Sequence, residues 1–169
     1  MNIRRVGAWT ATVAVATGIA ASSCSSKSAE VDTSRTVELI ASLKQRSVPG
    51  LPDPLTPEKA IEIEKWRTGP GGWFVEKGCF ACHDVSVYGI KNAAPVGPDL
   101  ALAVEDVQAR FGMPLEEFFK APVGTMTIVL SQMIVLSPEE KAVAIEKLKE
   151  ANRAYKNAKK EKDGGRSGS

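Results

Sequence analysis

The sequence predicts an all-α domain of several short helices, preceded by an N-terminal extension. Two observations lead to this fold class. Several segments carry apolar residues at helical spacing, opened by capping or proline signals and closed by glycine or proline. No long segment alternates apolar and polar residues as a half-buried strand would. The 169 residues therefore have room for one small domain after an N-terminal leader.

Residues 1–24 have the character of an export signal, because Arg4 and Arg5 precede an apolar run of mostly small residues. A membrane-spanning helix needs about 20 predominantly apolar residues, which favours a cleaved signal over a permanent anchor. The ending AASSC resembles a bacterial lipoprotein signal, in which Cys24 is lipidated. We expect a chain anchored by this lipid on the periplasmic side of a bacterial membrane. A plain secretory signal, which would leave the chain soluble in the periplasm, is the alternative.

The charge balance argues against nucleic-acid binding. The chain has 22 basic and 20 acidic residues, and loss of Arg4 and Arg5 with the leader makes the remainder formally neutral. Nucleic-acid binding requires a basic face. The basic bias is confined to residues 147–169, with eight basic and three acidic residues. We expect this run to be a solvated helix end, or a contact for anionic lipid or a partner protein.

Residues 25–55 are predicted to lie outside the main domain. A small, polar tether leads to a short amphipathic helix over residues 35–46. The stretch SVPGLPDPLTP that follows is too rich in proline to continue a helix. The sequence therefore predicts that the main domain begins at residue 56.

The first helices of the main domain have clear boundaries. Thr56 and Pro57 provide a cap and a first-turn proline for a helix that ends at the TGPGG stretch. A second short helix, WFVEKG, leads directly into a cysteine motif. Residues 84–100 are rich in glycine and proline and are predicted to be irregular. Two further helices, ALAVEDVQARF and LEEFFK, end at Gly112 and Pro122.

The final helix has the strongest start signal in the chain. Ser137 is its predicted cap, Pro138 occupies the first turn, and Glu140 stands where a capping box requires its acid. Its buried stripe is predicted to consist of Ala144, Ile145, Leu148, Ala151 and Tyr155. The main domain is predicted to span residues 56–158, with a flexible tail over residues 159–169.

The motif that carries chemistry is CFACH, residues 79–83, the attachment signature of c-type haem. Cys79 and Cys82 lie three positions apart on one side of a helical turn, where each thiol can add to one vinyl group of a haem. His83 then becomes the proximal ligand of the iron. If Cys24 carries lipid, none of the three cysteines is left over in an oxidising compartment. We therefore predict one covalently bound haem c with its iron.

Two other kinds of site contain C-x-x-C, but each explains fewer features of CFACH than haem attachment does. A redox dithiol needs no histidine after the second cysteine and prefers a βαβ context. A structural zinc site needs four ligands. The exported chain offers Cys79, Cys82 and His83, and Cys24 only if it carries no lipid.

The second axial ligand of the iron is restricted by composition. His83 is the only histidine, which excludes bis-histidine ligation within the chain and a second haem c. The sixth ligand is then a methionine, a weaker ligand such as lysine, or absent. The methionines beyond the leader are Met113, Met126 and Met133, and any of them could instead fill a gap in the core.

Over residues 70–155 the chain resembles a class I (mitochondrial-type) monohaem cytochrome c. The similarity rests on CFACH, then GPDL (97–100), PVGTM (122–126) and LSPEE (136–140), in that order. It implies a cytochrome c-like fold around one covalent haem, with the final helix packed across the helix before CFACH. It also implies that the Pro98 carbonyl accepts a hydrogen bond from the His83 ring, which fixes the orientation of that ligand. Residues 25–69 lie outside the resemblance.

The resemblance and the local sequence together favour Met126 as the sixth ligand. Pro122 and Gly124 can turn the backbone before it, and PVGTM matches the family loop. Met133, close to the final helix, is the alternative, and the residues that follow it are predicted to be haem-pocket walls. Further walls are predicted to be Phe74, Phe80, Leu100, Leu102, Phe118 and Phe119, with Trp66, Trp73 and Tyr88 as weaker candidates.

These features predict an electron carrier rather than an enzyme. With both axial positions filled by the protein, no small-molecule substrate reaches the iron, and no other catalytic constellation is present. The expected partners are a redox protein that donates an electron and one that accepts it, in a respiratory or photosynthetic chain. Two alternatives stay open: a haem subunit stably built into a membrane complex, and a sensor or enzyme with an open haem site.

Overall fold

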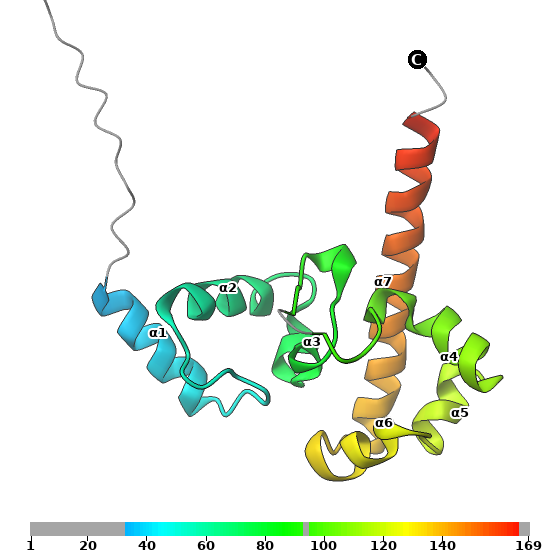
Figure 1. Ribbon diagram of the computed structural model, residues 1–169, viewed down its shortest axis with the longest axis horizontal. Coiled ribbons are helices and arrows are strands. Elements are labelled where there is room, and N and C mark those ends of the chain that lie inside the picture. The colour runs from blue at the N-terminus through cyan, green and yellow to red at the C-terminus, as the bar shows by residue number, and fades with distance from the viewer. Residues whose placement is uncertain (1–32, 93–94, 166–169) are drawn as a thin grey trace, which may run out of the picture. The chain divides into compact units, whose positions relative to one another are not determined.

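The computed structural model describes residues 33–92 and 95–165, and its elements are helical (Figure 1). Within these ranges there is no strand, and Val85 and Ile90 form an isolated antiparallel bridge. The predicted all-α class is confirmed. In chain order the elements are α1 (Thr33–Gln45), α2 (Pro57–Arg67), α3 (Gly72–Glu76), the 3-10 turns η1 (Cys79–Ala81), η2 (Ser86–Tyr88) and η3 (Leu100–Leu102), α4 (Ala103–Phe111), α5 (Leu115–Lys120), α6 (Thr125–Ile128), the π-helical turn η4 (Val129–Met133) and α7 (Pro138–Gly165).

The predicted leader and its lipidation site, Cys24, lie outside the described residues. Among the helices that the structure describes, none is both long enough and apolar enough to cross a bilayer.

The N-terminal extension is integrated into the domain. Leu43 of α1 is 1% exposed, and Val48 and Leu55 in the following loop are also buried, all within one core cluster with residues from α2 to α7. The part of the extension from α1 onward thus belongs to the same compact unit as the rest of the described chain. The predicted boundary at residue 56 therefore does not separate two folding units, because the apolar side of α1 packs on α2.

The loop after α1 lies directly against the backbone of the CFACH turn. A Cβ atom added to Gly50 would lie under 3 Å from the Ala81 side chain, and one added to Gly78 would lie 2.6 Å from Cβ of Pro49. Both glycines have positive φ, +78° and +76°. At each contact one of the two segments contributes a glycine, which leaves room for the Cβ atom of the other segment. The extension therefore supports the turn that carries Cys79 and Cys82.

We expect Gly50→Ala to lower the free energy of unfolding more than Gly89→Ala does. Both positions are left-handed, with φ of +78° and +70°, but a Cβ at Gly89 would meet nothing within 4 Å. Alanine at Gly89 should cost the left-handed strain of about 1–2 kcal/mol. At Gly50 the overpacking should add about 1–3 kcal/mol. Denaturant unfolding of the two variants measures the difference, and equal losses would contradict tight packing of the loop on the turn.

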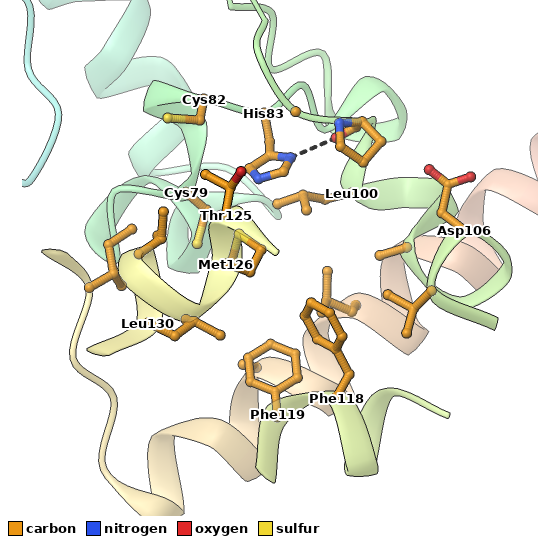
Figure 2. Close-up of a pocket in the computed structure, with 18 of the residues that line it drawn as sticks. Cys79, Cys82, His83, Leu100, Asp106, Phe118, Phe119, Thr125, Met126 and Leu130 are labelled. Atoms are coloured by element: carbon orange, nitrogen blue, oxygen red, sulfur yellow. Dashed lines mark hydrogen bonds between the residues drawn. The ribbon is translucent and has the colours of Figure 1, made fainter. Parts of the chain in front are cut away.

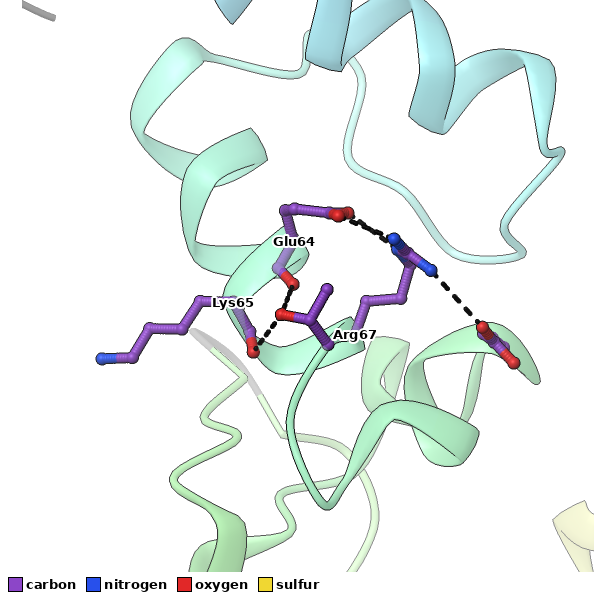
Figure 3. A network of polar contacts seen from close by, with 5 residues as sticks. Glu64, Lys65 and Arg67 are labelled. Atoms are coloured by element: carbon purple, nitrogen blue, oxygen red, sulfur yellow. Dashed lines mark hydrogen bonds and ion pairs between the residues drawn. The ribbon is translucent and has the colours of Figure 1, made fainter.

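Helix α2 begins as predicted and is tied to α3 by an arginine. The Thr56 hydroxyl accepts a hydrogen bond from the backbone N–H of Lys59 at 3.3 Å, which confirms the predicted cap. Arg67 donates two hydrogen bonds to Glu64, at 2.6 and 2.7 Å, and lies 3.6 Å from a carboxylate oxygen of Glu76 on α3 (Figure 3). The Arg67 guanidinium lowers the pKa of the Glu64 carboxyl. This bidentate pair fixes the end of α2 shortly before the CFACH turn.

The start and the buried stripe of α7 follow the prediction. The Ser137 hydroxyl accepts from the backbone N–H of Glu140 at 3.2 Å, and the Glu140 carboxylate accepts from the backbone N–H of Ser137 at 2.8 Å, so the capping box is confirmed. Ala144, Leu148 and Ala151 are buried. Ile145 and Tyr155 are half-buried.

The packing of α7 differs from that implied by the resemblance. Its main neighbours are η3, η2, α4 and α5, rather than the helix before CFACH. Buried Asn152 donates to the carbonyl oxygen of Ala101 at 2.9 Å, and Lys149 pairs with Glu116 at 2.6 Å. The Lys77–Glu140 ion pair links the residue after α3 to the start of α7. These polar contacts place α7 chiefly on the second half of the chain.

Two segments are more helical than the sequence predicts. Helix α7 continues to Gly165, past the predicted boundary at residue 158, because the residues beyond it are mainly lysine, glutamate and alanine, which favour helix. Residues 125–133, which are not among the predicted helices, form α6 and η4. Their β-branched residues disfavour helix locally, but Leu130 is buried in the core, and tertiary packing of this kind overrides propensity.

Candidate functional site

The four predicted iron- and haem-binding side chains border one cavity of about 470 Å³, a volume within the range of about 300–1,000 Å³ for ligand pockets. Figure 2 shows Cys79, Cys82, His83 and Met126 around it. The first three come from the CFACH turn, and Met126 comes from α6, more than forty residues later. The fold thus brings the predicted site together from two distant parts of the chain.

The two cysteines stand on the cavity side of the CFACH turn. Cys79 opens η1, and the N–H groups of both Cys82 and His83 donate to its carbonyl oxygen, at 3.3 and 3.1 Å. This turn geometry puts residues three apart on one side. Both thiols are free and half-buried. Two unpaired sulfurs therefore face one apolar space.

His83 is held by its Nδ1 atom, which lies 2.7 Å from the carbonyl oxygen of Pro98. A carbonyl oxygen can only accept, so Nδ1 carries the ring hydrogen and the Nε2 lone pair is left for a metal. Nε2 has no hydrogen-bond partner among the residues that the structure describes. The contact implied by the resemblance is present, and it sets the tautomer that an iron ligand needs.

Gly97 forms the support under the His83 ring. A Cβ at Gly97 would lie under 3 Å from Cε1, Nδ1 and Nε2 of the imidazole. The backbone N–H of Gly97 donates to the carbonyl oxygen of Cys82 at 2.9 Å, and that of Leu100 donates to Asp84 at 2.9 Å. The GPDL segment is thereby fastened along the CFACH turn, with its glycine against the ring.

The structure separates the two candidate methionines. Met126 is half-buried, borders the cavity and points into it (Figure 2). Met133, at the end of η4, is 68% exposed and is not among the residues that line the cavity. Gly124, with φ of +61°, precedes α6 and sets the direction from which Met126 enters. Of the two, only Met126 lines the cavity that His83 also borders.

The predicted walls are only partly those observed. Phe74, Leu100, Phe118, Phe119 and Trp73 line the cavity, and so do Ile134 and Leu136 after Met133. Phe80, Leu102, Trp66, Tyr88 and Val135 do not. Phe80 is buried on another side of its turn, with its ring 6.3 Å from that of Trp66, because a turn that presents Cys79 and Cys82 to the cavity points the residue between them elsewhere. Val135 is 70% exposed.

Helix α4 contributes wall residues that the sequence did not reveal. Ala103 and Val107 line the cavity, and so do Asp106 and Arg110, the one carboxylate and the one guanidinium among its described lining residues. The four lie on one face of α4 at spacings of three and four. This spacing was visible in the sequence, but nothing local indicated that this face would meet the CFACH turn.

The chemistry of the thiols argues against a redox dithiol. Burial raises the pKa of the Cys79 thiol to about 12, so this thiol is protonated at neutral pH. Thiol–disulfide exchange needs a thiolate, which is why catalytic dithiols have lowered pKa values. In residues 33–92 and 95–165, no three side chains of His, Cys, Asp or Glu form a group that could hold a metal ion. A zinc site therefore has no ligand set in this part of the chain.

Comparisons with protein-family models, with curated proteins and with solved structures found no match for this chain.

Proposed function

We propose that this chain is an exported monohaem c-type cytochrome that carries single electrons between redox proteins. The observation that carries the proposal is the convergence of Cys79, Cys82, His83 and Met126 on one cavity. Two thiols for covalent attachment, one imidazole and one thioether are the donor set of a His/Met-ligated haem c.

The side chains that border the cavity have the chemical types, and the free atoms, that a covalently bound haem requires. Cys79 and Cys82 are unpaired thiols, His83 presents a free Nε2, and Met126 approaches from α6. The surrounding walls are apolar, with phenylalanine, leucine and valine side chains from α3 to α7. When bound, haem supplies a one-electron Fe(III)/Fe(II) couple.

The protein residues set how that couple behaves. His83 is oriented by Pro98 and supported by Gly97, so little rearrangement is needed between oxidation states. The apolar walls exclude water from the metal, and a thioether ligand favours the reduced iron, so both raise the reduction potential. If His83 and Met126 both bound the iron, they would leave no place on it for a substrate. The site is thereby suited to electron transfer rather than to catalysis.

The proposal includes the location. The leader ending at Cys24 favours export and lipid attachment on the periplasmic side of a bacterial membrane, where haem c is attached. Because α1 is integrated into the core, the part of the predicted tether that precedes the described domain is residues 25–32. A cytochrome held in this way exchanges electrons with membrane complexes or with soluble periplasmic carriers.

Replacement of Cys79 and Cys82 tests the covalent haem directly. We expect the wild-type chain, produced together with a haem c maturation system, to keep one haem after denaturation and acid–acetone extraction. Cys79→Ala and Cys82→Ala should each lose one thioether bond, and the double variant should release all haem. The pyridine haemochrome spectrum and the intact mass measure this. A wild-type chain without covalent haem would overturn the proposal.

A further inference from the structure

Two charged side chains on α4 form a polar rim in an otherwise apolar cavity. Asp106 and Arg110 are separated by one helical turn, and their nearest charged atoms lie 3.6 Å apart. Both line the cavity, and the Arg110 side chain is 61% exposed while that of Asp106 is 31% exposed. This exposure places them at the edge where the cavity meets solvent.

The donors of Arg110 are largely unused. Its contact with Asp106 is an ion pair of 3.6 Å, longer than a hydrogen bond, and the guanidinium donates no hydrogen bond to any residue in the described ranges. By contrast, Arg67 bonds Glu64 and Lys149 pairs with Glu116. A guanidinium has five N–H donors arranged to match a carboxylate. Arg110 is thus a cation at the cavity with its donors still free.

We infer that Arg110 is the binding site for the propionate carboxylates of the haem, an inference that rests on the proposed function. The vinyl and propionate groups of haem lie on opposite halves of the macrocycle. Bonds from Cys79 and Cys82 hold the vinyl half, so the carboxylates are directed to the far side of the cavity. Figure 2 shows Asp106, the helix neighbour of Arg110, on the side away from the two cysteines.

The charge arrangement makes Arg110 rather than Asp106 the recognition group. Carboxylates that enter beside Asp106 meet a like charge, whereas a guanidinium offers them charge-assisted, bidentate hydrogen bonds. Among the described residues that line the cavity, Asp106 is the one acidic group and Arg110 the one permanent cation. Arg110 therefore leaves its long contact with Asp106 and pairs with the cofactor.

The test is the reduction potential of purified, haem-loaded protein as a function of pH, for the wild type, Arg110→Gln and Arg110→Lys. Arg110→Gln removes a cation beside the carboxylates. Loss of this positive charge stabilises the more positive ferric state, so the midpoint potential should fall. The unpaired carboxylates should also protonate at higher pH, so the rise of the potential on acidification should begin at higher pH. Arg110→Lys keeps the charge and should lie between the two.

Two controls separate this pairing from a general charge effect. Arg153, an exposed arginine on α7 that does not line the cavity, provides a matched loss of one charge, and Arg153→Gln should change neither the potential nor its pH dependence. Asp106 also loses its partner in Arg110→Gln, so the comparison is repeated in an Asp106→Asn background, where the pH effect should persist.

Equal shifts in Arg110→Gln and Arg153→Gln, or a pH effect that vanishes with Asp106→Asn, would overturn the assignment of Arg110 while leaving the cytochrome proposal intact. A wild-type chain that binds no haem would instead overturn the proposed function itself.

Discussion

Met126→Ala is expected to open the iron to carbon monoxide. If Met126 is the sixth ligand, as proposed, its thioether occupies that position in the reduced, haem-loaded wild type, and added carbon monoxide should leave the absorption spectrum unchanged. Without this side chain the iron has one protein ligand along its axis, and the gas should bind promptly and completely. The reduction potential should fall as well, because a methionine ligand raises it. Absorption spectroscopy of the ferrous protein measures the first effect and redox titration the second.

Met133→Ala is the matched control for this experiment. Met133 lies seven residues later in the same segment but is 68% exposed and outside the cavity lining, so its loss should change neither spectrum nor potential. If Met133→Ala opened the iron and Met126→Ala did not, the ligand assignment would be reversed. If the wild type itself bound carbon monoxide at once, a sensor or enzyme with an open site would be the better reading.

Gly97→Ala is expected to displace His83 and to destabilise the site. The added Cβ would fall under 3 Å from three atoms of the imidazole, so either the ring or the GPDL segment must move. The 2.7 Å contact between His83 and Pro98 would then lengthen or break. Overpacking costs about 1–3 kcal/mol and a lost hydrogen bond about 1 kcal/mol. We expect less haem per chain, a changed ferric spectrum and a lower free energy of unfolding.

Gly164→Ala provides the comparison for Gly97→Ala. A Cβ at Gly164, near the end of α7, meets nothing within 4 Å, and alanine favours helix over glycine by up to about 1 kcal/mol. Its haem content and spectrum should equal those of the wild type. A Gly97→Ala protein that is indistinguishable from Gly164→Ala would show that the imidazole does not rest on Gly97.

The proposed site also depends on residues of α4 and of the N-terminal extension. Arg110 lies on α4, Pro49 and Gly50 lie in the loop after α1, and neither segment belongs to the motifs that carry the resemblance. One is proposed to bind the carboxylates of the cofactor, and the other packs on the backbone of the attachment turn. Truncation of the chain to residues 56–158 would remove the second support.

Local features of the sequence were sufficient to predict the helix starts, the buried stripe of α7 and part of the site. The capping box at Ser137 and Glu140, the cap at Thr56 and the stripe on α7 each depend on residues within a turn or two of one another. Their geometry therefore follows from the chain itself, and the structure confirms it. The spacing of Cys79, Cys82 and His83 is local in the same sense, because one turn of chain puts both thiols on one side.

Other features of the fold and of the site depend on contacts between residues far apart in the sequence, and tertiary packing determined these. It selected Met126 over Met133 for the cavity, turned Phe80 away from it, brought Asp106 and Arg110 to its rim, and joined α1 to the core. It also made residues 125–133 helical against their propensity. The sequence by itself determined the all-α class, the helix starts and the attachment motif, since these arise within single turns of chain. The cavity, its lining and the position of Met126 in it depend on how helices pack, and this is a property of the whole chain.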